Sequence, residues 1–291
     1  RATLLELASG VDVVVTNVRP QAMQRLGLDY AALTAVNPSV IYCAAVGYGA
    51  GGPDAGKAVY DDLMQAASCI SGLFRAVDGA PKYAPINSCD RVVGLYLVIA
   101  ITSALHHRQA TGEGQEIEVN LLSSLLSAMV NQASSYVSGE VVPGILGNAH
   151  PSITPYEVYQ TADRPIVVAV GNDGQFAKLC QELGIPNIAT DPKFATNPDR
   201  VANRIPLNEL LVKQFLTNGA DHWWKLLSDA GVPCGPINSI SEAFALAESL
   251  ELNPIITINQ EGEERKQVAN PITFSQTPVR YAVAPPSLDE A

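Results

Sequence analysis

One carboxylate in the sequence stands where either a nucleophile or a helix cap could be placed. Asp90 follows an irregular stretch, residues 84–89, and precedes an apolar segment, residues 91–109, that is predicted to form a helix. A carboxylate at a helix start accepts hydrogen bonds from backbone N–H groups and suits the helix dipole. Its own surroundings therefore favour an N-cap. Catalysis stays open, because helix starts at the edge of a sheet are also where active sites form.

A glycine-rich loop, residues 47–53, follows a predicted strand and could bring its backbone close to a phosphate group. It is not a GxGxxG motif that opens directly into a helix, and the chain has no GK[ST] sequence of a P-loop. We therefore favour a tight structural turn over a phosphate site for this loop.

The other polar residues that could do chemistry have simpler structural interpretations. Asp61 and Asp62 could form a paired-carboxylate site, but they fit better the acidic first turn of a helix. His106 and His107 fit the last turn of another helix. His150 lies in a loop rich in Gly, Pro and Ser, where a single histidine is more often incidental. No residues have the spacing of metal ligands, and no GxSxG motif marks a nucleophilic serine.

The composition excludes several classes of protein. The chain has 291 residues, of which 47% are hydrophobic and 16% charged, as in a folded protein of one large or two modest domains. Its net charge of −11 makes it a poor binder of nucleic acid. Five cysteines without a CxxC pair fit a reducing cytoplasm. The longest apolar run, residues 92–105, is too short to span a membrane.

The elements that would position these residues alternate between strands and helices. Strands are predicted at 11–16, 40–46 and 117–119, and helices at 30–36, 61–74, 91–109 and 121–137. This alternation indicates an α/β fold with an open parallel sheet and helices on its faces. After a Gly/Pro/Ser-rich stretch, a strand at 166–170 and a helix at 175–183 indicate a second, smaller α+β domain. Because Arg1 enters in the middle of an apparent helix, we expect an N-terminal part to precede it.

Several motifs, in this order, resemble the class III CoA-transferase family, which includes formyl-CoA transferase and carnitine CoA-transferase. The matching stretches cover essentially the whole chain: residues 11–20, 25–30, 37–43, 47–53, 59–61, 111–115, 147–151 and 231–236. The resemblance implies a large Rossmann-like domain, incomplete at its N-terminus, a small domain and linkers. Two such subunits are expected to interlock in a homodimer. The implied parts are a CoA-binding domain at 1–120, a linker helix at 121–146, the small domain at 147–250 and a C-terminal return segment at 251–291.

The resemblance also implies site residues. The family's catalytic aspartate falls on Asp90, and the positions that line its CoA site fall on Asn17, Val18, Ala22, Arg25, Tyr60 and Leu121. Arg19 and Lys57 lie near Arg25 in the sequence, so this acidic chain would have local cations for the phosphates of CoA. One CoA-contacting lysine of formyl-CoA transferase falls on Ala58, which leaves the details of phosphate binding open.

The implied reaction moves CoA from an acyl-CoA donor to a small carboxylic acid, without a metal. Asp90 would form a mixed anhydride with the acyl group and then an aspartyl-CoA thioester. Backbone N–H groups near the start of its helix are expected to stabilise the oxyanions that develop. An active-site loop of formyl-CoA transferase falls on His150, Pro151 and Ser152, although the glycines of that loop are not repeated here.

The related α-methylacyl-CoA racemases share the fold and are the alternative. They use a histidine and an aspartate to move the α-proton of an acyl-CoA. Their aspartate also falls on Asp90, but their histidine falls on Tyr60, and a supporting glutamate falls near Gln160. A tyrosine is a poor base at neutral pH. Transfer is therefore favoured over racemisation, and an inactive acyl-CoA-binding protein or a CoA-lyase-like relative are remote alternatives. No nucleic acid, membrane or metal is expected as a partner.

Overall fold

The computed structural model describes residues 1–74, 79–145, 147–260 and 262–286. The contacts within the chain divide it into two compact units, Arg1–Pro151 and Ser152–Ala291. The first unit contains the parallel sheet and Asp90, and the second contains a separate, antiparallel sheet. The finer division at residues 120, 146 and 250 stays a prediction.

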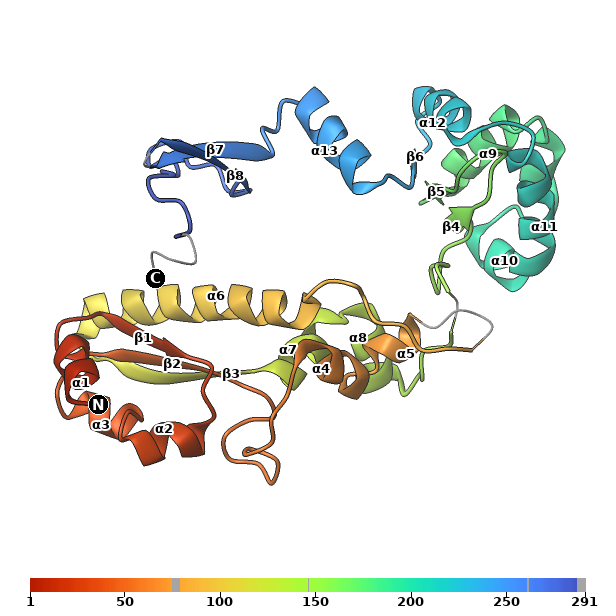
Figure 1. The fold of residues 1–291 in the computed structure, drawn as a ribbon. Coiled ribbons are helices and arrows are strands. Elements are labelled where there is room, and N and C mark those ends of the chain that lie inside the picture. Colours follow the sequence, from red (N-terminus) through yellow and green to blue (C-terminus); the bar gives the residue numbers. More distant parts are fainter. Residues whose placement is uncertain (75–78, 146, 261, 287–291) are drawn as a thin grey trace. The chain divides into compact units, whose positions relative to one another are not determined.

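The sheet of the first unit is parallel, as the alternation of strands and helices predicted. Its strands are β1 (Val13–Thr16), β2 (Ile41–Val46) and β3 (Gln115–Asn120), in the spatial order β1-β2-β3. Figure 1 shows the long helix α6 (Ser88–Thr111) along one face of this sheet, with α2 (Pro20–Leu26) and α3 (Tyr30–Thr34) on the other. Helix α1 (Ala2–Ala8) contributes Ala8 to the same core cluster as α2 and α3.

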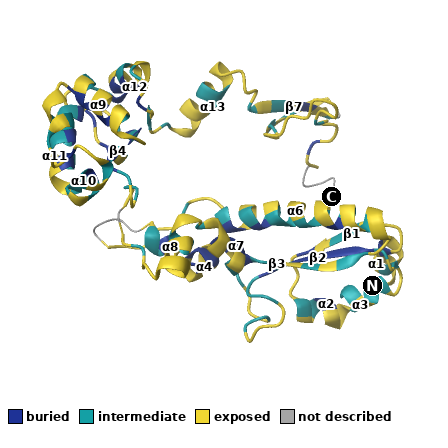
Figure 2. Ribbon diagram, turned by 180° about the vertical axis from the view of Figure 1, so that it is seen from behind, coloured by how far each residue is buried: buried dark blue, intermediate teal, exposed yellow. Residues whose placement is uncertain are grey.

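Strand β2 is buried on both faces because it lies in the middle of the sheet. Tyr42, Ala44 and Val46 pack in the core cluster with α1, α2 and α3. Ala45, which points to the opposite face, packs in the cluster that includes Val93 of α6. Figure 2 shows the strand as a buried band between exposed helix surfaces. A continuous apolar run is what a parallel strand covered on both faces requires.

Helix α6 starts earlier than predicted, and this changes the position of Asp90. The helix begins at Ser88 after the N-cap residue Asn87, so Asp90 lies inside the first turn and its interpretation as an N-cap was wrong. At the other end, Arg108 pairs with Asp12 at 2.6 Å and so ties α6 to the segment before β1. The C-terminal end of the helix that carries the candidate nucleophile is therefore held to the sheet layer.

By length and composition alone, α6 could also cross a membrane. The helix has 24 residues and is apolar enough for such a span, so the prediction that no apolar segment reaches that length was wrong. In the structure Val93 and Ala104 of α6 are buried. Leu95, Val98 and Ile99 are 59–60% exposed on its surface. The helix is thus packed against the sheet on one side and bears an uncovered apolar stripe.

Two predicted long helices are each broken into two. The segment predicted at 61–74 forms α4 (Asp61–Ala67) and α5 (Ile70–Leu73), and the one predicted at 121–137 forms α7 (Leu121–Ala128) and α8 (Asn131–Gly139). Cys69 and Val130, at the two breaks, have positive φ angles of 74° and 40°. A right-handed helix cannot continue through such residues. Because neither break contains Gly or Pro, the sequence does not signal it.

Gly114, which precedes β3, is the glycine that the sheet most requires. A Cβ at this position would lie 2.2 Å from the carbonyl oxygen of Val40 and 2.5 Å from the carbonyl carbon of Ser39, both backbone atoms. We expect Gly114→Ala to lower the free energy of unfolding by roughly 1–3 kcal/mol or more, since backbone cannot move aside as a side chain can. Urea denaturation measures this. Gly51→Ala, where a Cβ meets nothing within 4 Å, is the control, and equal effects of the two would contradict the close approach.

The second unit is built on an antiparallel sheet in the order β4-β5-β6. Its strands are β4 (Tyr156–Tyr159), β5 (Ile166–Ala169) and β6 (Cys234–Pro236). Phe176, Leu211 and Trp223 lie in its buried core. The helices are α9 (Asp173–Glu182), the 3-10 turn η1 (Pro186–Thr190), α10 (Asn197–Ala202), α11 (Arg204–Phe215) and α12 (Ala220–Asp229). The chain continues through α13 (Ile240–Ser249) into the hairpin β7 (Ile255–Gln260) and β8 (Glu263–Val268).

A fully buried arginine organises the helical side of the second unit. The Arg200 guanidinium donates to the carbonyl oxygens of Thr154 at 2.7 Å and Phe194 at 3.1 Å, and to the Asp173 carboxylate at 2.7 Å. It also lies 4.4 Å from the centre of the Phe176 ring. Its charge is thus paired and its donors serve backbone carbonyls from two separate segments, which is the condition for a buried charge to be tolerated.

Candidate active site

A cavity of about 530 Å³ opens at the carboxyl end of the parallel sheet. Asn17, which follows β1, Gly47, which follows β2, and Leu121, which follows β3, all line it. Asp90 and Val93 of α6 form another wall. In open α/β sheets, ligands bind outside the carboxyl ends of the strands, and the candidate nucleophile lies at this edge.

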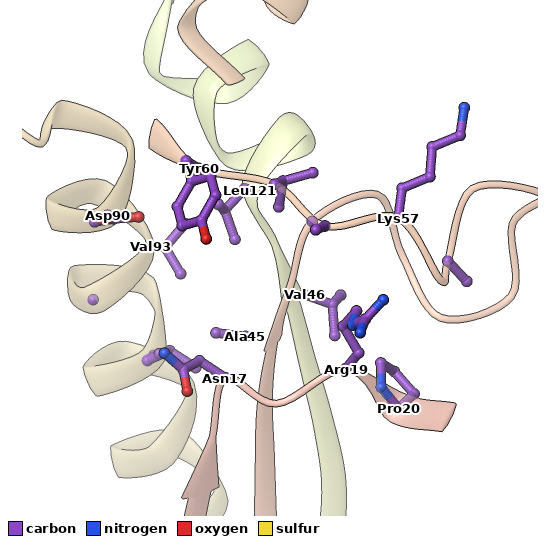
Figure 3. Close-up of a pocket in the computed structure, with 16 residues that line it drawn as sticks. Asn17, Arg19, Pro20, Ala45, Val46, Lys57, Tyr60, Asp90, Val93 and Leu121 are labelled. Carbon is purple, nitrogen blue, oxygen red and sulfur yellow. The ribbon is translucent and has the colours of Figure 1, made fainter. Parts of the chain in front are cut away.

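The two sides of this cavity differ in charge. Figure 3 shows Asp90 and Tyr60 on one side and Arg19 on the other, with Asn17 at the base. Lys57 lines the same side as Arg19, but its side chain extends away from the cavity and its Nζ atom pairs with the Asp54 carboxylate at 2.9 Å. The Arg19 guanidinium donates to the carbonyl oxygen of Gly56 at 2.9 Å, which fixes it against the loop that follows the glycine-rich turn. A ligand with a reactive carbonyl at one end and anionic groups at the other matches this arrangement.

The surroundings of Asp90 make its ionised form less favourable than in water. Asp90 as a residue is exposed, but partial loss of water around its carboxyl is the larger cause of its raised pKa, and the nearby negative charge of Asp61 is the second. The backbone N–H of Asp90 donates to the Oδ2 atom of Asp61 at 3.0 Å. A carboxylate of raised pKa is a stronger nucleophile once ionised, because basicity and nucleophilicity rise together.

For Asp61 the sequence favours an acidic first turn over a paired-carboxylate site, and the structure places it next to Asp90. Its side chain is 8% exposed at the start of α4. The Oδ1 atom accepts from Gln65 Nε2 at 2.6 Å, and Gln65 Oε1 accepts from the backbone N–H of Ala84 at 2.9 Å. The spacing of Asp61 and Gln65, four residues apart on one helix, is the one signal that the sequence offered.

The Cys89 thiol and two backbone N–H groups lie beside the Asp90 carboxylate but take no part in its proposed chemistry. The Cys89 thiol is fully buried, and burial, followed by the charges of Asp61 and Asp90, raises its pKa to about 12, so it stays protonated. The N–H groups of Asp90 and Arg91 already donate, the first to Asp61 and the second to the carbonyl of Asn87. The prediction that N–H groups at this helix start stabilise the oxyanion was therefore wrong for these two.

The structure brings part of the predicted CoA set together. Asn17, Tyr60 and Leu121 line the cavity with Asp90. Ala22 and Arg25 line a smaller cavity of about 260 Å³, which shares Arg19 with the first. Val18 lines a third cavity, together with residues of β2 that face α2 and α3. The contacts of these residues with CoA stay predictions.

The loop predicted at His150, Pro151 and Ser152 stands at the junction of the two units. These residues are not among those that line the Asp90 cavity. Asn197 of α10 holds the end of the loop, since its side chain donates to the Ser152 carbonyl at 2.8 Å and accepts from the Thr154 N–H at 3.1 Å. The catalytic role of the loop stays a prediction.

Across the described residues, no cluster of three or more His, Cys, Asp or Glu side chains could hold a metal ion. The polar side chains that line the Asp90 cavity are one carboxylate, a phenol, an amide and two cations: Asp90, Tyr60, Asn17, Arg19 and Lys57. These groups suit covalent catalysis by a carboxylate on an anionic substrate.

Several known proteins that are similar to this chain are named as CoA-transferases. The chain is 39% identical over 290 residues to succinate–glutarate CoA-transferase from Agrobacterium fabrum, covering 99% of this chain and 72% of that protein. It is 36% identical over 257 residues to acetyl-CoA:oxalate CoA-transferase from Acetobacter aceti, covering 88% of this chain and 66% of that protein. The chain thus spans about two thirds to three quarters of the length of these relatives.

The fold has solved counterparts. The crystal structure of a CAIB/BAIF family protein from Brucella suis superimposes with a TM-score of 0.85 at 37% identity, covering 99% of this chain and 75% of that one. These relatives support CoA-transferase function and confirm the resemblance predicted from the motifs. Residues 1–291 match CoA-transferase family III throughout, and the chain belongs to that family.

Proposed function

We propose that the protein transfers CoA from an acyl-CoA to a carboxylic acid with Asp90 as the covalent nucleophile. The observation that carries this proposal is the position of Asp90 in a cavity at the carboxyl edge of the sheet, opposite Arg19 and Lys57. The cations suit the phosphates of CoA, and the carboxylate suits its thioester. The proposed CoA-binding set adds Asn17, Tyr60 and Leu121.

The proposed reaction starts with attack of the Asp90 carboxylate on the acyl carbonyl of the donor. The carbon–sulfur bond breaks, CoA leaves as a thiolate and a mixed anhydride remains on Asp90. The thiolate then attacks the aspartyl carbonyl, which releases the donor acid as a carboxylate and leaves an aspartyl-CoA thioester. Each step replaces one acyl bond by another, so no oxidant or net proton is required.

The second half of the reaction repeats these steps in reverse order. The acceptor carboxylate attacks the aspartyl thioester, CoA leaves as a thiolate and a second anhydride forms. Attack of the thiolate on the acceptor's carbonyl gives the new acyl-CoA and frees the Asp90 carboxylate. Water would hydrolyse the anhydride rapidly. The proposed reaction therefore requires the cavity to be closed to solvent during these steps.

Dicarboxylic acids are the proposed substrates, because the relatives are named for succinate, glutarate and oxalate. We expect succinyl-CoA and glutarate to give glutaryl-CoA and succinate, measured by chromatography of the CoA esters. The racemase alternative predicts deuterium uptake from D₂O at the α-carbon of a 2-methylacyl-CoA without an acceptor. We expect no uptake, because Tyr60 stands in the racemase histidine's place. Uptake without transfer would overturn the proposal.

The architecture proposed for the complete protein is a Rossmann-like domain in an interlocked homodimer. Two features support a second copy. Leu95, Val98 and Ile99 leave an apolar stripe on α6 uncovered, and α13 contributes no buried residue within its own chain. Surfaces of this kind are usually covered by a protein partner. A cytoplasmic location is proposed as well, and the five free cysteines support it.

A further inference from the structure

We propose that Asp61 is a positioning residue for Asp90, which fixes the start of α6 by a hydrogen bond and destabilises the ionised nucleophile by its negative charge. This inference rests on the proposed role of Asp90 as nucleophile. Asp61 does not line the cavity that contains Asp90, so it would act through Asp90 and not on the substrate.

The Asp61 carboxylate is buried and held by hydrogen bonds to both of its oxygens. Asp61 is 8% exposed, and its two oxygens have different partners. Oδ2 accepts from the Asp90 N–H at 3.0 Å and Oδ1 accepts from Gln65 Nε2 at 2.6 Å. Gln65 is fully buried and pairs with the backbone of Ala84 through both its amide atoms, at 2.9 Å and 3.4 Å. The loop before α6, α4 and the nucleophile are thereby joined in one hydrogen-bonded chain.

The hydrogen bond from the Asp90 N–H to Asp61 takes the place of a side-chain cap at the start of α6. The N-cap residue of α6, Asn87, makes no side-chain hydrogen bond to the helix. An uncapped helix leaves its first N–H groups without partners, and a carboxylate close to them is stabilised by the helix dipole. Asp61 supplies this cap from another helix, at the residue that carries the nucleophile. The backbone of Asp90 therefore stays fixed while its side chain reacts.

The negative charge of Asp61 has an effect on Asp90 that is separate from the hydrogen bond. Two carboxylates close together raise the energy of the doubly ionised state. Asp90 loses its charge when it becomes an anhydride or a thioester, so the repulsion from Asp61 is relieved by acylation and favours it. The other titratable groups in the cavity, Arg19, Lys57 and Tyr60, are not among the causes of the raised pKa of Asp90, which are burial and Asp61.

The test separates charge from structure with three variants. Asp61→Asn removes the charge and keeps an oxygen that can accept from the Asp90 N–H. Gln65→Ala removes the side chain that bonds Asp61 Oδ1 and the Ala84 backbone, and it keeps the negative charge of Asp61. Asp62→Asn removes a charge one residue away on the exposed side of α4 and is the control. The readouts are the pH profile of kcat/KM for succinyl-CoA with glutarate, and the melting temperature of each variant.

We expect Asp61→Asn to move the acidic limb of the profile to lower pH and to reduce kcat roughly three- to tenfold, as Brønsted behaviour predicts for a less basic nucleophile. Gln65→Ala should lower the melting temperature without moving that limb to lower pH, and Asp62→Asn should match the wild type. A limb unchanged in Asp61→Asn, at a folded melting transition, would overturn the inference. Failure of the wild type to transfer CoA, or to be modified at Asp90, would instead contradict the proposed function.

Discussion

Asp90→Asn is expected to lower kcat for CoA transfer on the order of 10³-fold or more, the scale of losses on removal of a catalytic nucleophile. The amide has almost the shape of the carboxylate but cannot form the anhydride or the thioester. Because Asp90 lies inside the first turn of α6 and bonds to Asp61 through its backbone, that hydrogen bond is kept. The measurement is the initial rate of glutaryl-CoA formation from succinyl-CoA.

The control for this loss is Asp62→Asn, which makes the same chemical change at an exposed position of α4. Its kcat should stay close to that of the wild type. A melting temperature of Asp90→Asn near that of the wild type shows that the loss is chemical. An Asp90→Asn protein that keeps wild-type turnover would remove Asp90 from the mechanism.

Arg200→Met is expected to be the most destabilising single change in the second unit, by about 3–5 kcal/mol, because several buried carbonyl oxygens lose their donor at about 1–3 kcal/mol each. Arg200 is fully buried, and its loss leaves the carbonyls of Thr154, Phe194 and Ala195 without this donor. The methionine fills part of the volume and supplies no hydrogen bond. Urea denaturation, monitored by the fluorescence of Trp223 and Trp224 in the same unit, measures the change.

Lys213→Met is the matched control, because it removes a positive charge from an exposed position on α11 in the same unit. Its free energy of unfolding should stay within about 0.5 kcal/mol of the wild type, as for most surface substitutions. If Arg200→Met also stayed within that range, the hydrogen bonds of the guanidinium would not stabilise the fold.

The sequence predicted the strands and helices that are determined by interactions between residues close together in the chain. The predicted strands at 11–16 and 40–46 became β1 and β2, and the predicted helix at 30–36 became α3. Its N-cap residue, Asp29, accepts from the Ala32 N–H at 3.2 Å through Oδ1. An apolar strand and an N-cap act over a few residues, so their signals survive in the sequence. The parallel order of the sheet followed from the alternation of these strands with helices.

The errors fall where contacts between distant residues decide the structure. Asp90 resembled a cap by itself, but Asp61, far away in the sequence, supplies the hydrogen bond at this helix start. Cys69 and Val130 interrupt predicted helices at positive φ, without Gly or Pro to signal it. The sequence carries no signal that Arg200 is buried, and only its packing in the structure shows it. Tertiary contacts override local preference at each of these positions.

The sequence predicted those site residues that lie in the motifs shared with the family. Asn17, Tyr60 and Leu121 were placed by resemblance, and the structure puts all three around the cavity of Asp90. Arg19 was noted only as a nearby cation, and it lines the same cavity. The closeness of Asp61 to the Asp90 backbone had no signal beyond its spacing to Gln65, because it depends on how α4 packs against α6.

The measurement that tests covalent catalysis by Asp90 most directly is chemical trapping of the intermediate. The protein is incubated with succinyl-CoA, quenched with hydroxylamine or borohydride, digested, and its peptides are mapped by mass spectrometry. We predict a hydroxamate or a reduced side chain at Asp90, dependent on the acyl-CoA and absent in Asp90→Asn. Full turnover of glutarate to glutaryl-CoA by a protein that shows no modification at Asp90 would contradict the account.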